Sequence, residues 1–307
     1  MALSRRPSPS RLRTVLVATD FSPAGARAVE RTARLPLATK ATVILLHALP
    51  GRAPKEFVKQ ARERASRTLA VVAQELHASL HAAGSSASVE ARLVFGKPAP
   101  TLLRQARSAG ADLIVLGRHG RRPLRDLFLG STAEHVIQYG PSPVLVVHGL
   151  VEDGYRHPLV AVDTDKTSRH VASFLPALLT PRTSLRLIHA YESPLEYIVF
   201  PGLTLEERAR YREQFKEAAL RKLHPLHRHL DAMDLSYHQA LEHGSPRSII
   251  LKEARRHRAD LLALGTLARS SLSRVLLGSV ATDVVREAGC DVLLVRPPAK
   301  GRGRTRH

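Results

Sequence analysis

Three glycines and a Ser-Thr pair lie at a spacing suited to holding phosphate. Gly117, Gly120 and Gly130 form the pattern G-x2-G-x9-G, and Ser131 and Thr132 follow directly. Glycine lets backbone N–H groups approach an anion closely. A helix N-terminus adds unpaired N–H groups and the positive end of its dipole. The apolar run 112–116 before the motif and the helical pattern 133–139 after it therefore predict a strand, a phosphate-binding loop and a helix.

The motif differs from two other phosphate-binding loops. No Lys-Ser or Lys-Thr pair follows a glycine as G-x4-G-K-[ST] requires, and the pattern G-x-G-x-x-G is absent. A nucleophile elbow, a paired-carboxylate site and a metal-protease helix are also absent. A phosphate-binding loop without an evident base to activate water favours binding over fast turnover, with slow hydrolysis as the enzymatic alternative.

Several histidines could be mistaken for catalytic or metal-binding groups. His47 and His189 end apolar strands, where a hydrogen-bonded core histidine is the expected role. His224, His227 and His229 are spaced by three and then two residues, so they do not share one helix face. We therefore expect no metal site and no tightly bound structural metal.

Composition limits the class of protein. The 307 residues carry a net charge of +20, but arginine is scattered, aromatic residues are few, and no nucleic-acid module is recognisable. This composition argues against specific nucleic-acid recognition and leaves loose polyanion binding as an alternative. No apolar run approaches the roughly 18 residues of a membrane helix. The single cysteine, Cys290, is expected to be buried and inert, and the chain to be cytoplasmic.

The second half of the chain repeats the first. The repeat runs from Asp20 and Asp163, through the two glycine motifs, to the apolar segments 144–147 and 292–295. We predict two homologous domains, 13–150 and 155–298, joined by a linker near 149–156 and flanked by basic tails, 1–12 and 299–307. The flexible first tail lacks the apolar core of a secretory signal.

Each half alternates strands and helices, which predicts a parallel sheet covered on both faces. Ser22-Pro23 should cap and open a helix, a strand is expected over 42–48, and Ala83-Gly84 should end the following long helix. Pro225 should kink or break the matching helix of the second half. The aromatic-rich loop 191–202 before that helix is either a lid or a packing surface.

Ligands of such sheets bind beyond the carboxyl ends of the strands. Asp20, Ala48 and Gly117 each stand at a strand end, so we expect them to line one crevice. Asp20 and Asp163 have a second possible role as helix N-terminal charges.

The motif and the ordered landmarks resemble, twice over, the universal stress protein family. The resemblance implies tandem α/β domains, each a doubly wound parallel five-stranded sheet of order 3-2-1-4-5, similar to the adenine nucleotide alpha hydrolase-like fold. It also implies ATP, with or without Mg²⁺, as the cofactor. Asp20 would contact the adenosine part and the Ala48 backbone the adenine. The phosphates would be held by Gly117, Gly120, Gly130 and Ser131. On chemistry alone, Thr132, Arg118 and His119 are plausible additions.

The second copy departs from the motif, because Ala268 stands where the second glycine is expected. Its remaining site positions are Asp163, Ala190, Gly265, Gly278 and Ser279. We expect ATP mainly in the first domain and weak or no binding in the second.

The resemblance implies a stress-response regulatory or adaptor protein with an unidentified protein partner. A nucleotide-free structural adaptor is the remaining alternative. In the family the fifth strand mediates dimer contacts, so the two fifth strands of this chain should pair internally as a pseudo-dimer, with a homodimer as a further option.

Overall fold

The structure is a computed structural model that describes residues 11–49, 55–118, 129–164, 167–192, 202, 204–266 and 278–296. His119, Gly120, Ala268 and most of the aromatic-rich loop 191–202 lie outside the described residues. The predictions made for them therefore stay predictions.

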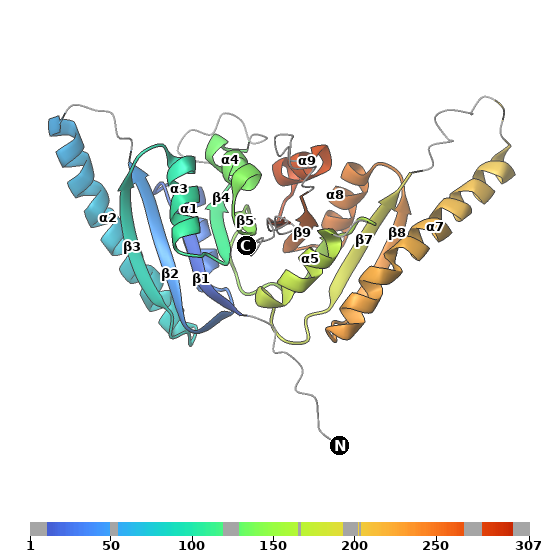
Figure 1. Ribbon diagram of the computed structural model, residues 1–307, viewed down its shortest axis with the longest axis horizontal. Helices are drawn as coiled ribbons and strands as arrows, with labels where there is room; N and C mark the ends of the chain where they lie inside the picture. Colours follow the sequence, from blue (N-terminus) through green and yellow to red (C-terminus); the bar gives the residue numbers. More distant parts are fainter. Residues whose placement is uncertain are drawn as a thin grey trace, which may run out of the picture.

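Ten strands form one sheet in the order β3-β2-β1-β4-β5-β10-β9-β6-β7-β8. Each half has the predicted order 3-2-1-4-5, and all pairs within a half are parallel (Figure 1). The strands are β1 Leu12–Ala18, β2 Leu37–Leu49, β3 Ser88–Phe95, β4 Leu113–Gly117, β5 Val144–Val147, β6 Pro158–Ala161, β7 Leu185–Tyr191, β8 Tyr237–His243, β9 Leu261–Gly265 and β10 Asp291–Val295.

Helices cover both faces of the sheet, as the apolar strands require. Buried residues of α1, α2, α5 and α7 pack on one face, and those of α3, α4, α8 and α9 pack on the other. The helices are α1 Pro23–Ala33, α2 Lys55–Ala82, α3 Pro98–Ser108, α4 Ser131–Tyr139, α5 Thr167–Phe174, the short 3₁₀ helix η1 Leu175–Ala177, α7 Leu205–Ala232, α8 Pro246–Arg256 and α9 Ser279–Glu287.

Most local predictions are confirmed. Ser22 caps α1 by accepting a hydrogen bond from the Gly25 N–H at 3.1 Å, and Gly84 follows α2 with a positive φ of 76°. Strand β2 is longer than the predicted 42–48, because its first residues also pair with β1, Leu12 beside Leu37. The prediction that the helix breaks at Pro225 is wrong, since α7 continues through that residue.

The two halves join through their fifth strands. β5 and β10 pair antiparallel, with Val146 opposite Val292 and Val144 opposite Leu294. All four side chains are buried, so the apolar core runs across the seam without interruption. The predicted internal pairing of the fifth strands is therefore confirmed.

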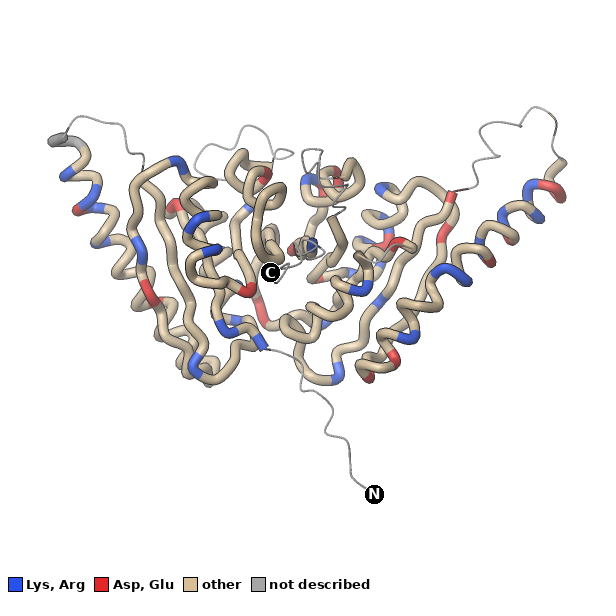
Figure 2. Tube along the Cα trace, viewed as in Figure 1, with Lys and Arg blue, Asp and Glu red and all other residues tan. Residues whose placement is uncertain are grey.

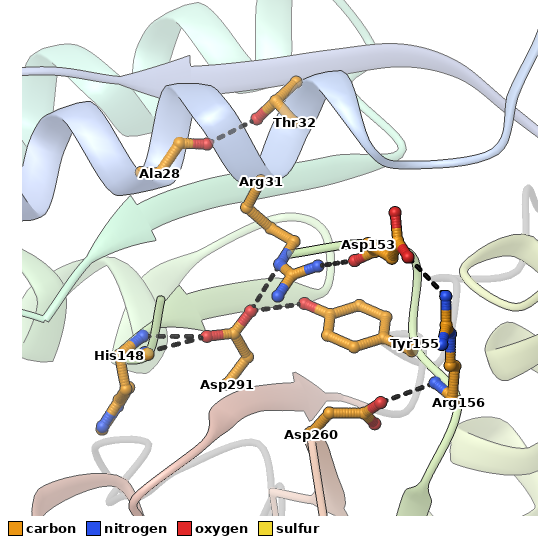
Figure 3. Close-up of polar contacts among 10 residues, drawn as sticks. Ala28, Arg31, Thr32, His148, Asp153, Tyr155, Arg156, Asp260 and Asp291 are labelled. Carbon is orange, nitrogen blue, oxygen red and sulfur yellow. Dashed lines mark hydrogen bonds and ion pairs between the residues drawn. The ribbon is translucent and has the colours of Figure 1, made fainter. Parts of the chain in front are cut away.

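A buried polar network crosses the seam on one face of the sheet (Figure 3). The Asp291 carboxylate accepts hydrogen bonds from Arg31 Nε at 2.7 Å and from the Tyr155 hydroxyl at 2.8 Å. Arg31 also lies over the Tyr155 ring, 4.5 Å from its centroid. Tyr155 belongs to the predicted linker, yet its side chain is 1% exposed. The connection is thus anchored in the core at this residue.

Lysines and arginines are spread over the helices and strands of both halves, as Figure 2 shows. Opposite charges are interspersed among them along α2 and α7. This distribution agrees with the scattered arginine of the sequence.

Candidate functional site

The carboxyl ends of β1, β2 and β4 meet at one edge of the first half's sheet (Figure 1). Asp20 follows β1, Ala48 lies at the end of β2, and Gly117 ends β4. The register fixes this convergence, because β1 pairs in parallel with both neighbours: Val17 lies beside Leu45 on one side and Val115 on the other. The structure therefore brings three predicted site residues to one edge.

Asp20 is held in a tight turn before α1. Its Oδ1 accepts a hydrogen bond from the Ser22 N–H at 3.0 Å. A Cβ added at Gly25 would stand 3.0 Å from that same oxygen, so glycine leaves room for the carboxylate. Asp20 thus supports the turn that opens α1, and the proposed contact with a ligand is an additional role.

Gly117 has a packing role that the motif did not reveal. A Cβ at this position would lie 2.4 Å from the Ala24 carbonyl oxygen, which is closer than atoms can approach. Its counterpart Gly265 is similarly confined, because a Cβ there would lie 2.2 Å from Thr167 Cγ2. Both glycines therefore let the first helix of their domain pack against the fourth strand.

The base of the glycine loop is closed by backbone hydrogen bonds. The Gly130 N–H donates to the Arg118 carbonyl at 3.1 Å, and the Arg118 N–H donates to Val147 at 3.2 Å. Gly130 is the N-cap of α4, with φ −64° and ψ 141°. These are extended angles that any residue can adopt. Its backbone conformation alone does not require glycine.

Helix α4 begins directly at this loop base. Its first intrahelical hydrogen bond joins the Glu134 N–H to the Gly130 carbonyl at 3.0 Å. The N–H groups of Ser131, Thr132 and Ala133 precede that bond and so have no partner within the helix. The Ser131 side chain is exposed and that of Thr132 is half-buried. This helix start can offer N–H and hydroxyl donors to an anion.

The Arg118 side chain makes a contact that the sequence did not predict. Its guanidinium donates to the Arg286 carbonyl at the end of α9, in the other domain. In return, Arg296 donates to the Ile137 carbonyl at 2.8 Å, at the end of α4. Each helix end thus receives a positive charge from across the seam, where the helix dipole favours it. Comparing the two halves of the sequence does not reveal these two arginines, because Thr266 matches Arg118 and His148 matches Arg296.

The second crevice contains the same landmarks in a different setting. Asp163 is exposed, and its Oδ1 accepts from the N–H of the next residue, Thr164, at 2.7 Å. Ala190 lies in β7 and Gly265 ends β9. Gly278 is the N-cap of α9, which begins at Ser279.

The strand-end histidines are core residues, as predicted. His47 is buried and its Nδ1 donates to the Thr19 carbonyl at 2.8 Å. His189 does the same with Val162, also at 2.8 Å. Within the described ranges, no group of three or more His, Cys, Asp or Glu residues could hold a metal ion.

The comparison with known proteins agrees with this architecture. The sequence profile of the universal stress protein family matches residues 11–148 and 154–296. The chain belongs to the universal stress protein family. The two matches make it a tandem member, with one family unit in each half of the sheet.

Several relatives of this universal stress protein align with it over most of their own length. A universal stress protein of Mycolicibacterium smegmatis is 26% identical over 301 residues, covering 92% of this chain and 97% of the relative. A universal stress protein of Mycobacterium tuberculosis is 28% identical over 219 residues, covering 68% of this chain and 69% of that relative. The crystal structure of an Archaeoglobus fulgidus universal stress protein superposes with a TM-score of 0.68 at 20% identity, covering 92% of this chain and 98% of that one. This likeness supports the fold.

Among the described residues of this universal stress protein, no helix is long and apolar enough to cross a membrane.

Proposed function

We propose that this universal stress protein is a regulatory or adaptor protein of the stress response that binds ATP in the crevice of its first domain. The observation that carries the proposal is the closed base of the glycine loop. It sets the start of α4 at the same sheet edge as Asp20 and Ala48. A ligand with an anionic end and a polar, hydrogen-bonding end fits this combination of groups.

The proposed contacts follow from the position of each group. The N–H groups at the start of α4, with the Ser131 and Thr132 hydroxyls, face the phosphates together with the loop glycines Gly117, Gly120 and Gly130. The Asp20 carboxylate accepts hydrogen bonds from the adenosine part, because ionised carboxylates only accept. The backbone at Ala48, at the end of β2, meets the adenine.

We propose the same division of roles between the halves that the sequence indicates. Within the proposed domains 13–150 and 155–298, the first carries the nucleotide and the second binds weakly or serves as structure. Two observations support this difference: Ala268 replaces a motif glycine, and Asp163 accepts a hydrogen bond from its own neighbour. Asp163, Ala190, Gly265, Gly278 and Ser279 form the weaker site.

Calorimetric titration of ATP into nucleotide-stripped protein tests the site. We expect about one ATP per chain for the wild type and loss of binding for Gly130→Val, because the side chain would obstruct phosphate approach where glycine now lies. Gly278→Val is the matched control, since Gly278 has nearly the same angles, φ −58° and ψ 149°. Titrations with Mg²⁺ and with a chelator show whether the metal contributes. Equal binding by wild type and Gly130→Val would refute the assignment.

The regulatory step we propose is ordering of the loop between Gly117 and Gly130 by bound ATP, which changes a surface that a partner protein recognises. The loop carries several arginines, which can pair with phosphate. Hydrogen exchange should therefore slow in this segment when ATP is added, and the Gly130→Val variant should show no change. Identical exchange in the wild type with and without ATP would argue against the step.

A further inference from the structure

The turn that follows β1 contains a residue in an unusual backbone conformation. Phe21 has φ +60°, in the left-handed region. Bulky side chains seldom occur there, because Cβ approaches the following carbonyl too closely. Such conformations persist where the surrounding structure imposes them, and they are concentrated at functional sites. Phe21 directly follows Asp20, a residue of the proposed site.

Contacts on both sides hold Phe21 in this conformation. Its ring packs on the His47 ring, with centroids 4.3 Å apart and planes 31° apart. His47 is in turn fixed by its bond to the Thr19 carbonyl, and the Phe21 N–H donates to Thr19 Oγ1 at 3.1 Å. The aromatic pair thus ties the turn after β1 to the end of β2.

The left-handed residue determines where the Asp20 carboxylate lies. It reverses the chain so that the Ser22 N–H reaches Asp20 Oδ1 at 3.0 Å, while the Ser22 side chain caps α1. Gly25 leaves room for the carboxylate in this position, because any Cβ there would stand 3.0 Å from it. Asp20 is therefore pre-positioned at the crevice before a ligand arrives.

The second domain lacks this arrangement. Thr164 takes the place of Phe21. Unlike Phe21, it is not one of the described non-glycine residues whose φ is positive. The Asp163 carboxylate accepts a hydrogen bond from the Thr164 N–H. The Ser168 hydroxyl bonds to the Asp163 backbone and not to its carboxylate: it accepts from the Asp163 N–H at 2.8 Å and donates to the Asp163 carbonyl at 2.9 Å. The same aspartate is thus held differently in the two crevices.

We propose that Phe21 is a positioning residue that makes the first crevice selective for nucleosides. Its left-handed turn holds the Asp20 carboxylate where it accepts hydrogen bonds from the ribose hydroxyls of the nucleotide. The first crevice therefore prefers a nucleoside triphosphate to inorganic triphosphate, and the second crevice lacks this preference. This inference rests on the proposed ATP site and adds the residue that sets its selectivity.

A pair of substitutions separates the turn from the aromatic ring. Phe21→Gly removes the ring but keeps the left-handed conformation, which glycine adopts readily. Phe21→Thr introduces the residue of the second domain, whose branched Cβ disfavours that conformation. We expect Phe21→Gly to bind ATP within about threefold of the wild type. Phe21→Thr should bind it about tenfold or more weakly, the usual effect of losing a hydrogen bond to a charged group.

Inorganic triphosphate is the second ligand, titrated by calorimetry into the same full-length proteins. Its affinity should be the same in the wild type and both variants, because it has no ribose to meet Asp20. A general disturbance of the fold would lower both affinities together and would refute the proposal. Thermal unfolding checks each variant, and Phe21→Ala replaces Phe21→Thr if the latter fails to fold.

Two further results would overturn the inference. Wild-type affinity for ATP in Phe21→Thr would show that the turn does not position Asp20. Equal weakening by Phe21→Gly and Phe21→Thr would assign the effect to the ring rather than to the turn. Failure of the wild type to bind ATP would instead refute the proposed function together with this inference, so the two failures are distinguishable.

Discussion

At the scale of single residues, two buried groups at the start of β10 lie next to each other with different roles. The Asp291 carboxylate binds Arg31, Tyr155 and the backbone of His148. Cys290 is buried, and this burial, with the nearby charges of Asp291 and Asp260, raises the pKa of its thiol from 9.0 to about 12. The raised pKa keeps the thiol protonated at neutral pH, and its burial confirms the prediction from the sequence.

The raised pKa of Cys290 predicts a loss of stability at high pH. Above pH 9 the unfolded chain releases the thiol proton while the folded chain keeps it, so unfolding becomes easier as pH rises towards 12. The expected contribution is about 1.4 kcal/mol per pH unit. Urea unfolding between about pH 8.5 and pH 10.5 measures it, with Cys290→Ser as the control, because Ser142 holds the matching place in the first domain. Parallel pH profiles of the two proteins would contradict the prediction.

At the scale of elements, helix α7 shows how tertiary packing outweighs a local signal. Pro225 lacks the N–H that a helix interior needs, yet α7 continues through it. Leu223, Leu226 and Leu230 lie buried on both sides of Pro225 and hold the helix on the sheet. The proline itself is exposed. Packing of this face therefore offsets the missing hydrogen bond.

Replacing this proline should stabilise the protein. Pro225→Ala restores one backbone N–H and removes the ring from an exposed helix position, which should raise the free energy of unfolding by about 1–3 kcal/mol. Urea unfolding gives this value. Thr204→Ala is the opposite control, since Thr204 and Glu207 form the capping box of α7 and its loss costs about 1 kcal/mol. A lower stability of Pro225→Ala would show that the ring contributes packing.

At the scale of the whole molecule, the seam makes one continuous sheet of two family units. The antiparallel pairing of β5 with β10 leaves β3 and β8 as the only outer strands among the described residues. The Asp291 network joins the halves on one face, and Arg118 and Arg296 join them on the other. The relative position of the halves is therefore fixed by both apolar and polar contacts.

Removing the central carboxylate should weaken the seam strongly. Asp291→Ala leaves the buried Arg31 without its charge partner, and such a loss costs about 3–5 kcal/mol. Tyr155→Phe removes one hydrogen bond to the same carboxylate and should cost about 1 kcal/mol. Urea unfolding of the full chain gives both values. Similar stabilities of the Asp291→Ala variant and the wild type would mean that the network adds little to the seam.

Much of the fold could be predicted because its signals are local. The apolar strands, the Ser22 cap and the end of α2 at Gly84 depend on nearby residues, and the internal repeat predicts that both halves share one topology. The order of the strands was implied by the family resemblance. The candidate site was predictable in part, because parallel strands bring their carboxyl ends together whatever the details of packing. The packing roles of Gly117 and Gly265 were not, since each depends on a helix far away in the sequence.

The sequence by itself determined the two-domain repeat, the alternation of strands and helices, the edge of the sheet where the candidate site lies and the burial of Cys290, and its resemblance to the family implied the strand order. Only the tertiary structure showed that Tyr155 of the linker enters the core, that Arg118 reaches the opposite domain and that Phe21 is left-handed. The physical reason is the separation along the chain over which each kind of interaction acts. Hydrophobic pattern and turn residues act over a few positions, whereas seam contacts and backbone strain depend on which distant atoms meet.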